Sequence, residues 1–130
     1  MVDFWPEPAD AVPVAQAILA PRFTGVAIKD EMPETRPSTF IVVSRIGGEQ
    51  TNPKQDRATL LIEFWAESSA VAAQMARTGR AALRNSRGKE WAGVFSYGWS
   101  NENGPTDFND SKIQDRRRCQ LVGDLTLSTG

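Results

Sequence analysis

Apolar residues alternate along residues 59–66 and predict a strand that passes directly into a helix. Side chains of an extended chain point to opposite faces in turn, so every second residue shares a face. One face of this strand is fully apolar, and it carries Leu60, Ile62, Phe64 and Ala66. The other face mixes Leu61 and Trp65 with Glu63. We therefore expect a sheet that is buried on the first face and only partly covered on the second.

The helix after this strand is expected to run from Ser68 or Ser69 to about Arg84. A serine hydroxyl is a common N-cap because it accepts a hydrogen bond from the first turn. Small and apolar residues recur at steps of three and four, which is typical of a helix that packs closely on a sheet. The opposite side of the helix carries Gln74, Arg77, Arg80 and Arg84. The strand and the helix together are expected to form the centre of the core.

The same patterns predict a second helix and four more strands. The helix begins after Asp10, tolerates Pro13 in its first turn and is closed by Pro21. The strands are expected at residues 25–29, 40–46, 94–100 and 117–127. The resulting order, α-β-β-β-α-β-β, predicts a single α+β domain spanning residues 1–130. Its mixed or antiparallel sheet should have about five strands, with both helices packed on one face.

Two polar segments and one aromatic strand complete the pattern. The segment from Gly47 to Arg57 is polar throughout and is expected to be a long β-hairpin arm between antiparallel neighbours. Residues 101–115 are expected to be a broad polar loop. Alternation along residues 94–100 places Phe95, Tyr97 and Trp99 on one face. Because one layer of helices covers one face of a sheet, the faces that bear Trp65 and Trp99 are candidates for subunit contacts.

The composition removes most kinds of reactive site. The 130 residues include one cysteine, Cys119, and no histidine, so the usual general base and the commonest metal ligand are missing. The formal net charge is −1, which gives no long-range attraction to nucleic acid or to an anionic membrane. No apolar run approaches the ~20 residues needed to cross a bilayer, and residues 1–6 lack the basic start of a signal peptide. We expect a non-enzymatic protein without cofactor or metal, made in the cytoplasm.

Two groups of residues with side-chain oxygens are candidates, one for a calcium site and one for a catalytic acid pair. Asp107, Asn109, Asp110 and Asp115 offer oxygen ligands for calcium, but the glycine and the closing glutamate of a calcium loop are missing. Glu63 and Glu67 lie on one strand face and form a candidate acid pair, yet no nucleophile accompanies them. We interpret the first group as a solvated loop. The two glutamates are expected to face solvent or a partner.

Arg116, Arg117 and Arg118 form the sharpest basic cluster. Such a run can hold phosphate through paired donors, but at the start of a strand it more often marks an exposed, charged edge. Gly47-Gly48 is not a phosphate loop, because no Lys and Ser/Thr follow it. The aromatic residues at 95, 97 and 99 resemble a platform for stacking bases, but basic residues are missing from that strand, so a core or subunit contact is favoured.

The chain as a whole resembles the tail terminator proteins of long-tailed bacteriophages, also called tail completion or minor tail proteins. The resemblance covers nearly the whole chain and lies in the order of weak features. These are the opening helix ending in Leu19-Ala20-Pro21, the strand from Val26 into a Pro-flanked segment ending at Pro37, the Phe-Ile-Val-Val strand entering Gly47-Gly48, the LLIEFWAES strand followed by an Ala-rich helix, Gly104-Pro105, and the Arg-rich final strand from Arg116 to Leu127.

The resemblance implies a structural virion protein that forms a ring, typically a hexamer, on the end of the tail tube. Its partners would be further copies of itself, the tail tube protein and the head-completion protein, with DNA passing through the ring without sequence-specific binding and no membrane contact. The arm would reach a neighbouring subunit or the tube. Candidate contact residues are Arg45, Gly47, Gly48, Lys54, Arg57, Glu63, Trp65, Arg116, Arg117 and Arg118.

Three other functions stay open at the level of sequence. The same α+β pattern suits other head-tail connector proteins, and a nucleic-acid-binding module would use the arginines at 116–118 with the aromatic strand, giving binding that weakens steeply with salt. An enzyme using Glu63 and Glu67 is least favoured and would require a deep pocket around both carboxylates.

Overall fold

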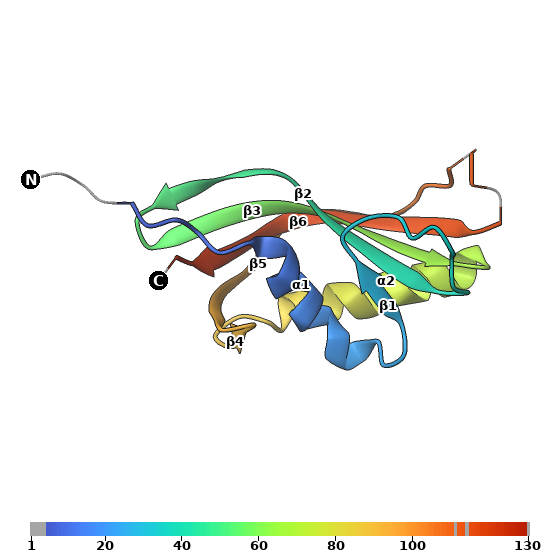
Figure 1. The fold of residues 1–130 in the computed structure, drawn as a ribbon, viewed down its shortest axis with the longest axis horizontal. Coiled ribbons are helices and arrows are strands. Elements are labelled where there is room, and N and C mark those ends of the chain that lie inside the picture. Colours follow the sequence, from blue (N-terminus) through green and yellow to red (C-terminus); the bar gives the residue numbers. More distant parts are fainter. Residues whose placement is uncertain (1–4, 111, 114, 130) are drawn as a thin grey trace, which may run out of the picture.

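The computed structural model shows one curled, six-stranded sheet with two helices on one face, and it describes residues 5–110, 112–113 and 115–129 (Figure 1). The α+β prediction is confirmed. The helices are α1 (Ala11–Leu19), the short 3₁₀ helix η1 (Ala20–Arg22) and α2 (Ser69–Arg84). The strands are β1 (Ala27–Lys29), β2 (Phe40–Asn52), β3 (Gln55–Ala66), β4 (Glu90–Trp91), β5 (Val94–Asp107) and β6 (Arg117–Ser128).

The strand order across the sheet is β1-β2-β3-β6-β5-β4. Only β1 and β2 run parallel, and every other neighbouring pair is antiparallel. The sixth strand, β4, escaped prediction because two residues cannot show a period-two pattern. The last strand of the chain, β6, lies inside the sheet between β3 and β5.

Both helices begin where the sequence predicts. The Asp10 side chain accepts a hydrogen bond from the Val12 amide at 3.1 Å, and the Ser68 hydroxyl accepts one from the Val71 amide at 3.2 Å. These bonds satisfy amide groups that a helix leaves unpaired in its first turn. In Figure 1, α1 and α2 lie on the same side of the sheet, where they contact each other, and α2 follows β3 directly.

The main core lies between this helix layer and the sheet. The predicted apolar face of β3 is fully buried there, together with the residues of β6 that alternate from Cys119 to Leu127. Burial in apolar surroundings raises the pKa of the Cys119 thiol, with a smaller contribution from Asp107. The thiol is therefore kept in its protonated, unreactive form.

Strand β5 is longer than predicted, because residues 101–107 continue it instead of starting a loop. The pairing with β6 shifts register three times along β5, and Asn101 and Gly104 have positive φ angles of 53° and 102°. Such irregularities interrupt the period-two pattern that marks a strand. The described residues of the predicted loop that lie outside a strand are 108–110, 112–113 and 115.

One of these shifts also overturns the predicted aromatic face. Pairing jumps between Ser96 and Gly98, so an extra residue enters the strand and Trp99 turns toward the main core. Phe95 and Tyr97 stay on the surface and contact each other edge to face, with ring centroids 5.0 Å apart. Trp99 is consequently not part of an uncovered aromatic platform.

Gly123 of β6 is the position at which the Trp99 ring meets the sheet. A Cβ atom at residue 123 would lie 2.2 Å from the ring, closer than real contacts allow. We expect Gly123→Ala to lower the free energy of unfolding by about 1–3 kcal/mol, because overpacking displaces the indole or the strand. Gly47→Ala is the matched control, since its Cβ would meet nothing closer than 3.9 Å. Equal denaturation midpoints for the two variants would contradict the packing described here.

Candidate functional site

The predicted arm is a hairpin formed by β2 and β3, with Pro53 and Lys54 in its turn. The hairpin is part of the sheet rather than a free-standing ribbon, because β3 pairs with β6 along its whole length, out to Gln55 and Ser128. The Thr129 amide also donates to the Lys54 carbonyl at 3.0 Å and fixes the turn. The exposed part of the arm is therefore β2 and the turn.

An ion pair holds the two strands of the hairpin at its base. The Arg45 guanidinium donates to both carboxylate oxygens of Asp56 at 2.8 and 3.2 Å, and its Nε donates to the Gly47 carbonyl at 2.9 Å. The hydrogen bond to Asp56, which is only 2% exposed, raises the pKa of Arg45. The structure thus uses Arg45 inside the monomer.

The two basic residues between Gly47 and Arg57 differ, because only one of them forms an ion pair among the described residues. Arg57 lies 3.3 Å from Glu49 and 3.8 Å from Asp124, so its charge is balanced on the sheet surface. Lys54 is exposed and makes no ion pair within the described residues. Gly48 has a structural reason to be glycine, since its φ is +100° and a Cβ would lie 2.0 Å from the Arg57 carbonyl oxygen.

Trp65 is fully buried, so the expectation that it lies on an uncovered sheet face is wrong. Its ring stacks on Phe40 at a centroid distance of 5.6 Å, with 9° between the ring planes. The segments that contain Met32 and Ile113 pack against this small second cluster, on the face away from the helices. Two long connections therefore cover what a single helix layer leaves open.

Arg118 completes this cluster and neutralises Glu63. Its guanidinium donates to the Glu63 carboxylate at 2.6 Å and to the Phe108 carbonyl at 2.7 Å. It also lies over the Trp65 and Phe108 rings, 5.2 and 5.0 Å from their centroids. Both charged side chains are about one-seventh exposed, so Glu63 is no longer a partner-facing carboxylate.

The other two arginines of the cluster differ from each other. Arg116 donates to the carbonyls of Pro37 and Arg36, both at 2.9 Å, and fastens the long connection before β2. Arg117 is exposed and makes no ion pair within the part of the chain that the structure describes. The predicted exposed edge is wrong, because β6 is an interior strand and two of the three arginines in the cluster bind the protein itself.

A second group of arginines lies on α2 and just beyond its end. Arg77, Arg80 and Arg84 follow one another at steps of three and four, which places them along one side of the helix, and Arg87 follows in the turn after it. Glu102 of β5 lies 3.7 Å from Arg80 and 2.6 Å from Arg84. We call these four arginines the basic surface. The sequence places three of them on one side of the helix but indicates no role for them.

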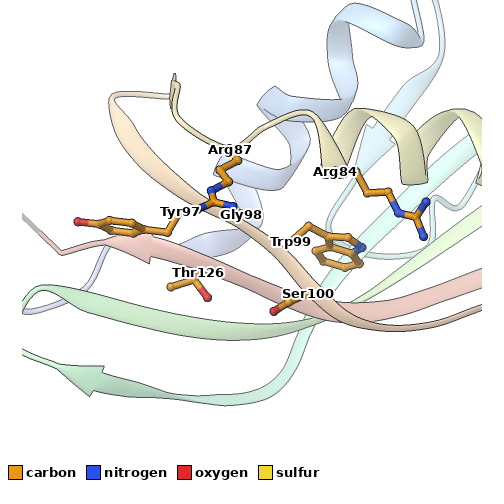
Figure 2. A pocket seen from close by; sticks show the side chains of 7 residues that line it. All are labelled: Arg84, Arg87, Tyr97, Gly98, Trp99, Ser100 and Thr126. Carbon is orange, nitrogen blue, oxygen red and sulfur yellow. The ribbon is translucent and has the colours of Figure 1, made fainter.

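The end of the basic surface borders a depression of about 340 Å³ (Figure 2). The stem of Arg87 crosses Gly98, 3.6 Å from the position of a Cβ there, and Arg84 lies beside Trp99. The exposed Tyr97 ring and the Ser100 and Thr126 side chains complete its lining. Arginine, aromatic and hydroxyl groups are suited to binding an anionic or polar partner.

Neither protein-family models nor curated proteins gave any match to this chain. Within the described residues, no three acidic or thiol side chains cluster in a way that could hold a metal ion. The described helices also include none with the length and apolar character needed to span a membrane.

Proposed function

We propose that this protein is a tail terminator subunit, which assembles into a ring on a phage tail tube and presents a joining surface to the head. The observation that supports this best is the outer edge of β2. Its pairing with β1 ends at Val42, and residues 45–49 are exposed beyond that point. Ile46, an apolar residue of this strand, is 55% exposed there.

An open strand edge of this length favours association with another chain. Unpaired backbone amides and carbonyls can extend a sheet into a neighbour, and proteins usually shield such edges with prolines, bulges or charges. β2 has a bulge near Ile46 but few charges beyond it, so this edge is only partly shielded. A neighbouring subunit or the tube protein would cover the edge and the Ile46 side chain, as the resemblance to tail terminators implies.

The test is assembly of the purified chain, alone and with tail tubes. We expect a species of six times the 14.3 kDa chain mass by light scattering, or rings at tube ends by electron microscopy. Ile46→Glu should abolish assembly, because a charge would be desolvated at the contact. Val71→Glu is the control, since Val71 is an exposed apolar residue on the helix layer. A wild-type chain that stays monomeric and ignores tubes would refute the proposal.

A second candidate function, nucleic-acid binding, is favoured only by the basic surface. The arginines at 116 and 118 bind within the protein, so any such contact would instead use Arg77 to Arg87. It would require duplex or single-strand binding that weakens steeply with salt. A different position in the head-tail connector is compatible with the same fold, and the tube-end images would distinguish it.

A further inference from the structure

The basic surface carries more positive charge than its surroundings balance. Arg80 and Arg84 share the single carboxylate of Glu102. Arg77 and Arg87 are exposed and form no ion pair within the described residues. Since the whole chain has a net charge of −1, this excess must be matched by an acidic excess elsewhere on the same molecule.

Part of that acidic excess lies at the opposite edge of the sheet, where three carboxylates are close together in the sequence. Asp30, Glu31 and Glu34 directly follow β1, the first strand in the sheet order, whereas Glu102 and the basic surface border β5, the fifth. All three carboxylates are exposed, and none takes part in an ion pair among the residues that the structure describes. We call residues 30–34 the acidic segment.

We propose that the basic surface of one copy binds the acidic segment of a second copy. The inference rests on the proposed ring and names the surfaces that close it. Two different patches on opposite edges give a head-to-tail contact, which generates a ring when the rotation closes. The sizes agree: five residues extend at most ~13 Å, and Arg77 to Arg84 span about 10 Å of helix.

A second copy fits this surface better than nucleic acid does. Glu102 neutralises the middle of the row of arginines, so the row offers no continuous track for a phosphate chain, whereas carboxylates on a short loop can approach the unpaired Arg77 and Arg87 individually. The near-neutral net charge also provides no general attraction to a polyanion. Complementary charges within one chain, by contrast, set the orientation of a self-contact.

The experiment uses two charge-reversed variants, and each should restore the assembly of the other when they are mixed. Arg77→Glu/Arg87→Glu leaves the acidic segment intact, and Asp30→Lys/Glu31→Lys leaves the basic surface intact. Each protein alone should associate at least tenfold more weakly than wild type, because like charges meet at every contact. An equimolar mixture should regain the ring, since every contact in an alternating ring then joins opposite charges. Light scattering measures both results.

The control is Arg22→Glu/Lys112→Glu, which changes the net charge as much as the arginine pair does at exposed residues that belong neither to the basic surface nor to the acidic segment. It should assemble like wild type, and circular dichroism should show all variants folded. If wild type forms rings and the arginine variant does so equally well, the inference fails and the proposed function stands. If wild type never assembles, the proposed function fails with it. Duplex DNA binding that is lost in the arginine variant, without repair by mixing, would overturn the self-contact.

Discussion

Replacing Trp65 by alanine is expected to lower the free energy of unfolding by about 3–5 kcal/mol, the range for truncating a buried tryptophan. The side chain is fully buried, stacks on Phe40 and lies under the Arg118 guanidinium. Its removal would leave a cavity under the connections that contain Met32 and Ile113, because these segments pack directly on the cluster. Urea denaturation followed by circular dichroism measures the loss.

Trp5→Ala is the matched control, because Trp5 is 45% exposed and its truncation should change stability by less than about 0.5 kcal/mol. The comparison also separates two roles for Trp65. A subunit contact would leave the monomer stable and reduce only assembly. If Trp65→Ala unfolds at the same urea concentration as wild type, the second apolar cluster does not stabilise the fold as described.

Replacing Arg118 by methionine is expected to cost about 2–4 kcal/mol, somewhat less than breaking a fully buried ion pair. Methionine keeps the apolar stem that lies over Trp65, so the loss reports mainly on the charge. Glu63 would be left without its partner at 2.6 Å while remaining largely shielded from water. Thermal or urea unfolding of the purified protein measures the change.

The neighbouring Arg117→Met provides the control, since Arg117 is exposed and should tolerate the change within about 0.5 kcal/mol. Glu63→Gln in the Arg118→Met background should recover part of the lost stability, because it removes the unpaired charge. If Arg117→Met and Arg118→Met lower the free energy of unfolding equally, the cluster acts only as a surface charge, as the sequence alone suggested. A double variant no more stable than Arg118→Met would argue against the ion pair as the cause.

The sequence by itself determined the elements whose signals are local. The period-two face of β3, the stripe of α2 and the caps at Asp10 and Ser68 each depend on residues within a few positions of one another. They were sufficient for the α+β class, for both helices on one face and for the hairpin between β2 and β3. The three-and-four spacing of the α2 arginines was also visible, but spacing cannot show which of them remain unpaired.

Only the tertiary structure decided which polar and aromatic residues are available to a partner. Arg118 meets Glu63 across 55 positions and Arg116 meets Pro37 across 79, so no local pattern reveals that these charges are bound. Trp65 is covered by connections with no regular period, and a bulge turns Trp99 away from Tyr97. Periodicity tells which face of an element a side chain occupies, whereas the cover over that face depends on distant parts of the chain.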